Sequence, residues 1–317
     1  MPTQPMKSNS LAGALFCTVL LALLSVPNSE AAPAGGNSAA TAKKVTLPLD
    51  PESKQAFALM DKREYIEAIK HFQAALKKGE RAELLEGKAF CEVQLRQNEE
   101  AMRDLNRAIV LKPERAGLYS LRARLDIANH KLIPAIADLE KLLSIEPDSV
   151  ESTLTLADCL NNTLQSERAL SLLDKTIARH PDNFKIYLLR AQVKTTMGEF
   201  AAALKDADKS VAMAPNNFRP YQRRAEIHRA LRQYEKALSD WDCFIKLNPK
   251  SEVGYENRAY TYLNLKNWQM ALKDWDKCTR IQPNRALYHD EKANTYERLG
   301  QSELAKKERL AASNCRY

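Results

Sequence analysis

A small residue returns at a fixed interval through most of this chain. Alanine recurs every 34 residues in two parallel series, and proline recurs at the same interval in a third. The three series are Ala101, Ala135, Ala169, Ala203, Ala237, Ala271 and Ala305; Ala89, Ala123, Ala157, Ala191, Ala225, Ala259 and Ala293; and Pro113, Pro147, Pro181, Pro215, Pro249 and Pro283. Self-similarity at such a period is typical of solenoids, in which each repeat packs on its neighbours. The chain is therefore predicted to be a repeat protein and not an enzyme.

Each repeat has the pattern of two short helices. In residues 184–217, apolar residues recur at helical spacing before and after Gly198, and Pro215 follows the second stretch. The central alanines allow two helix axes to approach closely. The residue before a proline avoids the helical conformation, so the second helix is expected to end there. One such pair of helices leaves an apolar face uncovered, so the repeats are expected to stack.

The repeat resembles the tetratricopeptide repeat. The period, the paired alanines, the closing proline and the aromatic residues that open the second helix carry this resemblance. Those aromatic residues are Tyr65, Phe200, Tyr234 and Trp268. The resemblance covers residues 49–317 and implies an all-α fold, a right-handed superhelical solenoid of antiparallel helix pairs. Its eight units begin near Leu49, Ala82, Ala116, Val150, Phe184, Phe218, Glu252 and Ala286.

The last unit departs from the pattern, because Lys306, Lys307 and Arg309 lie on a helix whose counterparts are apolar. We expect it to supply the polar capping helices that a solenoid needs where stacking stops.

Comparison of the repeats predicts an ion pair inside each helix pair. One position of the first helix is basic in six units, and the position sixteen residues later is acidic in the same six. These pairs are Lys88–Asp104, Arg122–Asp138, Arg190–Asp206, Arg224–Asp240, Arg258–Asp274 and Lys292–Glu308. In the fourth unit both positions are leucine, Leu156 and Leu172, as expected if the two side chains touch. The pairs are therefore interpreted as structural, with Arg224 and Asp240 within salt-bridge distance.

The N-terminus predicts export. Lys7 precedes an apolar run from Leu11 to Val26, and small residues around Ala31 follow it, which is typical of a cleaved signal peptide. The run is shorter than the roughly 20 residues of a membrane-spanning helix. Residues 1–31 are therefore predicted to be a signal peptide, with an uncleaved membrane anchor as the alternative. Residues 32–48 have the composition of a flexible linker. We expect the protein to be exported, periplasmic or secreted.

The sequence contains no catalytic, metal-binding or cofactor motif. A phosphate-binding loop, an HExxH zinc motif and a nucleophile elbow are all missing, and the histidines are dispersed over different repeats. The cysteines after Cys17 lack metal-site spacing. Cys243 and Cys278 are predicted to be free, buried thiols, with a bridge between them as the alternative. No catalytic residue, metal or cofactor is predicted.

The resemblance implies a binding surface on the inner face of the solenoid, which first-helix residues line. The mixture found there suits an extended segment of a partner, held by hydrogen bonds and charges with Tyr260 as an anchor. An ordinary solvated helix face is the alternative for any one of these residues. The predicted partner-binding residues are Lys185, Gln192, Arg219, Gln222, Arg223, Glu226, Arg229, Glu256, Tyr260 and Asn264.

The charge of the chain is uneven. The total is +8, and units five to seven are each net positive, whereas units two to four are each net negative. The predicted function is a non-catalytic protein–protein interaction scaffold in the extracytoplasmic space. Its partner is expected to be a protein or peptide, and an acidic partner would suit the positive charge. The alternative is binding of an anionic envelope polymer or lipid surface through units five to seven. Nucleic acid suits the charge but not the predicted export. The oligomeric state stays open.

Overall fold

The chain folds into helices throughout the region that the structure describes. The computed structural model describes residues 50–315, and within this range it contains sixteen α-helices and no strand. The fold is an all-α solenoid of helical repeats, as predicted. The segments predicted as signal peptide or anchor (residues 1–31) and as linker (residues 32–48) lie outside the described residues.

Two compact units make up the described chain, with the boundary between Lys131 and Leu132. The N-terminal unit contains α1 (Pro51–Asp61), α2 (Tyr65–Lys78), α3 (Ala82–Gln94), α4 (Asn98–Leu111) and α5 (Ala116–Ala128). The C-terminal unit contains α6 (Leu132–Ile145), α7 (Val150–Asn162), α8 (Ser166–Arg179), α9 (Phe184–Thr196), α10 (Phe200–Met213), α11 (Phe218–Ala230), α12 (Tyr234–Leu247), α13 (Glu252–Asn264), α14 (Trp268–Ile281), α15 (Ala286–Arg298) and α16 (Ser302–Asn314).

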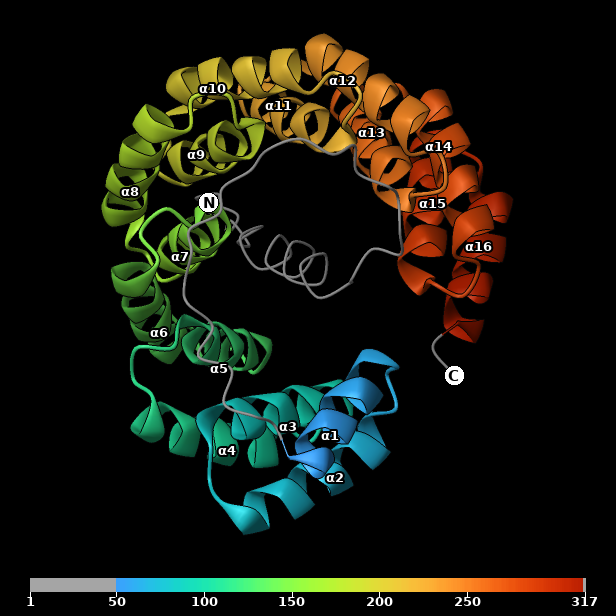
Figure 1. Ribbon diagram of the computed structural model, residues 1–317. Coiled ribbons are helices and arrows are strands. Elements are labelled where there is room, and N and C mark those ends of the chain that lie inside the picture. The colour runs from blue at the N-terminus through green and yellow to red at the C-terminus, as the bar shows by residue number, and fades with distance from the viewer. Residues whose placement is uncertain (1–49, 316–317) are drawn as a thin grey trace, which may run out of the picture. The chain divides into compact units, whose positions relative to one another are not determined.

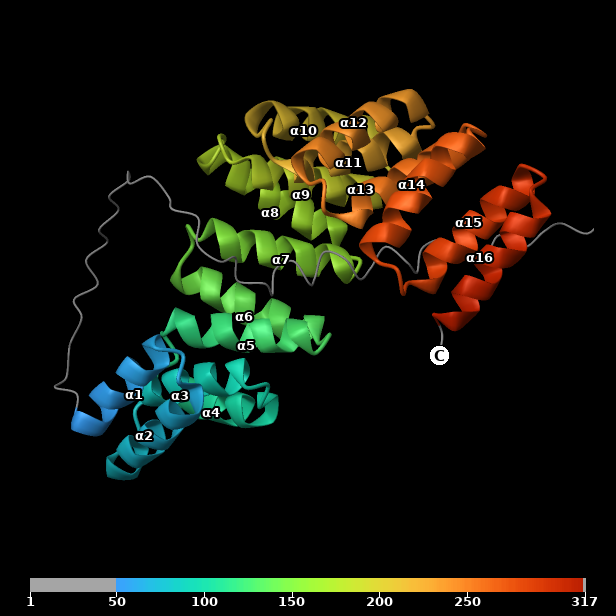
Figure 2. The same ribbon diagram turned by 90° about the vertical axis from the view of Figure 1, so that its right-hand side faces the viewer.

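The helices of each unit are arranged as stacked pairs. In the N-terminal unit, α1 packs on α2 and α3 packs on α4 (Figure 2). In the C-terminal unit, α7, α9, α11, α13 and α15 form the inner layer of the stack, and α8, α10, α12 and α14 form the outer layer (Figure 1). We call the inner side of α7, α9, α11, α13 and α15 the inner face.

The periodic alanines lie in the core. The members of both alanine series are at most 2% exposed, and the two alanines of a helix pair lie in one core cluster in the second, fifth, sixth and seventh repeats. A larger side chain at these positions would push the helix axes apart. First helices begin at the predicted starts of seven repeats, which are Ala82, Ala116, Val150, Phe184, Phe218, Glu252 and Ala286. The first helix of the array begins at Pro51, where the Asp50 carboxylate accepts hydrogen bonds from the backbone N–H groups of Glu52 and Ser53.

The turn inside each helix pair contains one residue in the left-handed region. Its φ lies between 57° and 80° in all eight repeats. Left-handed backbone suits glycine, yet only two of the eight positions hold it. The eight residues are Arg63, Arg96, His130, Leu164, Gly198, Arg232, Lys266 and Gly300.

The aromatic residue near the start of the first helix ties one repeat to the end of the one before. The Tyr187 hydroxyl donates a hydrogen bond to the Pro181 carbonyl (3.0 Å), and Tyr221 does the same to Pro215 (3.1 Å). In the last repeat, His289 contacts the Pro283 carbonyl through Nε2 (3.1 Å). In the repeats that have it, this bond ties the start of the first helix to the closing proline of the repeat before.

Candidate binding surface

All ten predicted partner-binding residues lie in the C-terminal unit, on three neighbouring inner helices. α9 carries Lys185 and Gln192, α11 carries five of the residues and α13 carries the remaining three. Because α9, α11 and α13 follow one another in the inner layer (Figure 1), the structure brings these residues onto adjacent helices. Their role in binding stays a prediction.

Four of the ten residues form a hydrogen-bonded line across the inner face. The Arg223 guanidinium donates to Gln192 Oε1 (2.8 Å) and to Glu226 Oε2 (2.8 Å), and Gln222 Nε2 donates to Glu226 Oε1 (3.1 Å). Gln192 Nε2 in turn donates to Asp158 Oδ1 on α7 (3.2 Å). We call these five residues the polar line. It connects α7, α9 and α11 and holds the side chains in fixed orientations.

The polar line is largely shielded from water. Burial raises the pKa of Asp158, although the nearby Arg223 charge and the amide donors of Gln192 and Asn162 oppose this shift. Arg223 Nε is buried and has no hydrogen-bond partner among the described residues. A buried donor without a partner is unusual in a folded protein.

A second cluster joins α13 to α15. The Tyr260 ring contacts Trp275 edge to face at 5.0 Å between centroids, and its hydroxyl donates to Glu291 Oε1 (3.4 Å). Tyr288 donates to Glu256 Oε2 (3.0 Å). Burial raises the pKa of Tyr260, and the negative charges of Glu291 and Glu256 raise it further. Tyr260 is thus part of the packing between two repeats and not a free aromatic anchor.

Three of the predicted residues are cations without an ion-pair partner among the described residues. Lys185 and Arg219 are exposed on α9 and α11, and Arg229 is half-exposed near the end of α11. The Arg219 guanidinium lies only over its neighbour Phe218, 6.0 Å from the ring centroid. These three side chains are free to meet an anionic group. The last predicted residue, Asn264, is exposed and donates to the Tyr260 carbonyl (2.8 Å).

Four other cations of the C-terminal unit, Arg190, Arg224, Arg258 and Lys292, lie in the predicted ion pairs. Arg224 Nη2 lies 2.7 Å from Asp240 Oδ1, which confirms the predicted ion pair. Arg224 Nη1 also lies 2.9 Å from Asp208, sixteen residues earlier and on the preceding outer helix. The hydrogen bonds with Asp240 raise the pKa of Arg224. We call the repeated arrangement the charge ladder, which comprises Asp174–Arg190–Asp206, Asp208–Arg224–Asp240, Asp242–Arg258–Asp274 and Asp276–Lys292–Glu308.

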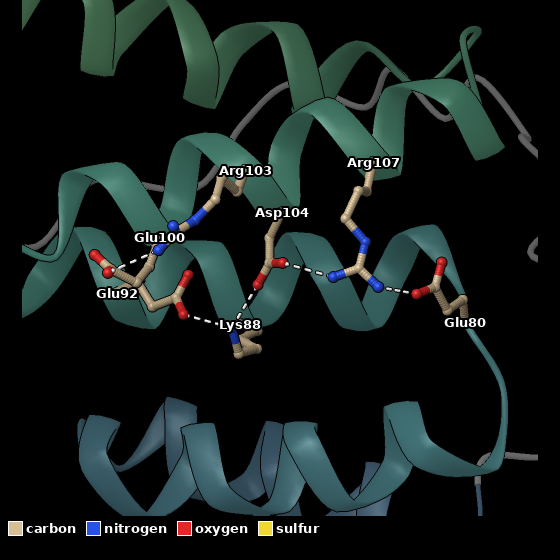
Figure 3. A network of polar contacts seen from close by, with 7 residues as sticks. All are labelled: Glu80, Lys88, Glu92, Glu100, Arg103, Asp104 and Arg107. Carbon is tan, nitrogen blue, oxygen red and sulfur yellow. Dashed lines mark hydrogen bonds and ion pairs between the residues drawn. The ribbon is translucent and has the colours of Figure 1, made fainter.

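The predicted pair of the second repeat is also present, with different surroundings. Lys88 Nζ lies 2.5 Å from Asp104 and 2.5 Å from Glu92, and Arg107 joins Asp104 to Glu80 (Figure 3). Burial raises the pKa of Glu92. The pair predicted between Arg122 and Asp138 is divided between the two units.

Sequence analysis missed the earlier carboxylate of the charge ladder and the Asp158 end of the polar line. Both were readable from the repeat. Asp174, Asp208, Asp242 and Asp276 recur every 34 residues, and Asp158 is in phase with the predicted Gln192, Glu226 and Tyr260. The position of a residue within the repeat does not by itself say which neighbouring helix its side chain contacts.

The structure also bears on metal sites, cysteines and membrane-spanning helices. Residues 50–315 contain no group of three or more His, Cys, Asp or Glu side chains that would hold a metal ion. Their five cysteines are free, including Cys243 and Cys278. Cys278 is buried as predicted, whereas the prediction of a buried thiol is wrong for Cys243, which is half-exposed on α12. No helix in the same range is long and apolar enough to cross a membrane.

Comparison with known proteins identifies the repeat. Family models described as tetratricopeptide repeat match residues 54–116 and residues 127–193. The chain is a tetratricopeptide-repeat protein. Such repeats generally form non-catalytic scaffolds that bind other proteins. No curated protein shows a significant match to this tetratricopeptide-repeat chain.

Solved structures share the tetratricopeptide-repeat fold at low sequence identity. A tetratricopeptide repeat protein from Parabacteroides merdae has a TM-score of 0.63 at 15% identity, covering 80% of this chain and 97% of that chain. The C-terminal part of a repeat protein from Cytophaga hutchinsonii has a TM-score of 0.57 at 16% identity, covering 73% and 95%. The APC/C hetero-tetramer Cut9–Hcn1 has a TM-score of 0.56 at 13% identity, covering 82% of this chain and 52% of that chain. These likenesses concern the fold alone.

Proposed function

We propose that this protein is a non-catalytic interaction scaffold of the extracytoplasmic space, which binds an extended segment of a partner protein on the inner face formed by α9, α11 and α13. The tetratricopeptide repeat supports a scaffold in general terms. The specific proposal depends on the arrangement of side chains on these three helices.

One observation carries the proposal: unpaired cations stand beside an immobilised polar surface. Lys185, Arg219 and Arg229 have no ion-pair partner among the described residues, whereas Arg223 and Glu226 are fixed in the polar line. Fixed hydrogen-bonding groups lose little entropy when a ligand binds, and free cations favour a carboxylate-bearing partner. The expected partner is therefore an extended polar segment with acidic residues.

The extracytoplasmic location is supported by the sequence of residues 1–31, where an apolar run follows Lys7 and precedes small residues at Ala31. Cell fractionation followed by N-terminal sequencing of the mature protein tests this part. A start at Ala32 is expected after cleavage. Recovery of the protein in the cytosol with its N-terminus intact would contradict export.

Proximity capture from the cell-envelope fraction tests the binding face. The test variant replaces Lys185, Arg219 and Arg229 by serine. Tyr260 is left intact because its ring packs on Trp275, so that its removal would disturb the fold. The matched control replaces Lys236, Lys246 and Lys277, three exposed lysines of the outer helices, by serine. A partner that is lost with the test variant and kept with the control supports the inner face. Equal capture by both variants would refute it.

A further inference from the structure

Helices α2, α3 and α4 of the N-terminal unit border a hollow of about 360 Å³. Its volume is within the range of small-molecule sites. All but one of its lining residues carry a charged or polar group. The lining residues are Gln73, Leu76, Lys77, Glu80, Lys88, Asp104 and Arg107.

In the C-terminal unit the equivalent place is filled by the charge ladder. There Arg224 occupies the groove between α10 and α12, with Asp208 on one side and Asp240 on the other. The repeat phase makes Lys88 the counterpart of Arg224, Asp104 that of Asp240, and Gln73 that of Asp208. The hollow therefore marks the groove in which the first carboxylate of the ladder is replaced by a neutral amide and the arginine by a shorter lysine.

Lys88 retains an unused donor. An ammonium group has three N–H donors. Lys88 Nζ uses two of them, on Asp104 and on Glu92, each at 2.5 Å (Figure 3). No acceptor for the third is found among the described residues, and the Lys88 side chain is 12% exposed at the wall of the hollow. In four other repeats the residue equivalent to Lys88 contacts a further carboxylate from the preceding repeat, which is Asp174, Asp208, Asp242 or Asp276.

The two carboxylates in the wall of the hollow are already paired with basic side chains. Arg107 contacts both Asp104 and Glu80, so the two acids in the wall already have partners (Figure 3). Lys77 and Gln73 are exposed at the rim, and their side chains make no hydrogen bond or ion pair with the described residues. The available groups are thus an ammonium, an amide and the third donor of Lys88, all of which can donate to an anionic oxygen.

We propose that this hollow binds a carboxylate group, which takes the place that Asp174, Asp208, Asp242 and Asp276 hold in the C-terminal unit. The carboxylate accepts hydrogen bonds from Lys88 and Lys77, with the Gln73 amide as a third donor. It belongs to a small organic acid or to an acidic side chain of a partner, since both present the same chemical group. The site is separate from the inner face, so it does not depend on the function proposed above.

Nuclear magnetic resonance of the whole protein labelled with ¹⁵N-lysine tests this site. The amide signals of Lys77 and Lys88 are identified with the variants Lys77→Arg and Lys88→Arg. Titration with acetate at constant ionic strength is expected to shift both signals in a saturable manner, whereas the neutral acetamide shifts neither. A capped tripeptide with a central glutamate, compared with its glutamine counterpart, shows whether a protein side chain also enters. If only acetate binds, the ligand is a small acid. If the glutamate peptide binds as well, the ligand is an acidic side chain of a partner.

The matched variants are Gln73→Asp and Gln73→Asn. Aspartate supplies the missing carboxylate from the chain itself and should weaken acetate binding by at least about tenfold, because the site is then filled as in the other repeats. Asparagine has the same size without the charge and should leave binding within about twofold of the wild type. Failure of acetate to produce a saturable shift, equal shifts with acetamide, or unchanged binding in Gln73→Asp would each overturn the proposal.

Discussion

A leucine pair in the fourth repeat stands where the neighbouring repeats hold an arginine and an aspartate. Leu156 and Leu172 occupy the places of Arg224 and Asp240, and Leu156 is only 4% exposed. Replacing a buried ion pair by apolar residues of similar volume is often neutral for stability, whereas removing one partner leaves an uncompensated charge. The helix pair therefore accommodates either both charges or neither.

This reasoning predicts the behaviour of charge-ladder variants. Arg224→Leu is expected to lower the free energy of unfolding by about 2–4 kcal/mol, because Asp240 is 3% exposed and loses its main partner. The double variant Arg224→Leu/Asp240→Leu, which reproduces the fourth repeat, should return to within about 1 kcal/mol of the wild type. Urea denaturation of both variants measures this. A double variant no more stable than Arg224→Leu would show that the two positions are not coupled.

Glu308 should give the last repeat a dependence on acid. Burial disfavours its charge, but hydrogen bonds from Lys292 and His289 outweigh this and hold the pKa of Glu308 below its ordinary value of 4.5. A carboxylate with a lowered pKa stabilises the fold above the unfolded-state pKa, and this contribution is lost as the pH falls through the folded-state pKa. Glu308→Gln should therefore cost about 1–2 kcal/mol near neutral pH and progressively less below pH 4.5.

Urea denaturation at several pH values measures the difference between Glu308→Gln and the wild type. Glu303→Gln on the same helix is the control, since the Glu303 side chain is 86% exposed and should change stability little. A constant difference across the pH range would contradict the assignment to Glu308.

Single-residue contacts were predictable where a change in one repeat exposed them. The joint change to Leu156 and Leu172 revealed the pairing of Arg224 with Asp240 sixteen residues later. Asp208, sixteen residues earlier, lies on a different repeat, and sequence phase alone does not say which repeat lies alongside. The polar line eluded sequence analysis for the same reason, because Asp158, Gln192 and Arg223 lie on three successive repeats.

At the scale of the helix pair, six turns hold a non-glycine residue in the strained left-handed conformation, and the sequence does not reveal this strain. Gly198 predicted its own turn, but no pattern of residue types predicted the left-handed conformation of Leu164 (φ 61°). An L-residue pays about 1–2 kcal/mol for this conformation. The stacking of the two helices fixes the turn and imposes the same backbone whichever residue is present.

Leu164→Gly should therefore stabilise the protein by about 1 kcal/mol. The side chain is 86% exposed, so no packing is lost. Leu164→Ala is the control, because it removes the exposed apolar surface and keeps the Cβ atom, and it should change the free energy of unfolding by less than about 0.5 kcal/mol. Thermal and urea denaturation measure both variants. Equal stabilisation by alanine and glycine would attribute the gain to the loss of exposed leucine and not to the backbone.

At the scale of the whole molecule, the sequence predicted the helices better than the way they group. The repeat phase fixed the start of seven first helices, since each helix pair is a local structure whose pattern is complete within 34 residues. The boundary between Lys131 and Leu132 interrupts neither the alanine series nor the proline series. Grouping of repeats depends on the packing between particular pairs of neighbours, which the shared positions of the repeat do not encode.

The charge of the C-terminal unit separates the scaffold from its alternative, a binder of anionic polymers or lipid surfaces. Attraction to an extended anionic surface weakens steeply as the Debye length falls from about 30 Å at 0.01 M salt to about 8 Å at 0.15 M. A partner held on the inner face by hydrogen-bonded and apolar contacts as well as by charge is expected to lose less than about tenfold in affinity over this range. Biolayer interferometry with the captured partner and with vesicles of anionic lipid measures both affinities.

The variant lacking Lys236, Lys246 and Lys277 should keep the affinity for the partner, because these exposed lysines lie on the outer helices. The opposite result would be binding that weakens steeply with salt, is lost when Lys236, Lys246 and Lys277 are replaced, and is kept when Lys185, Arg219 and Arg229 are replaced. That result would make the basic outer surface the functional one.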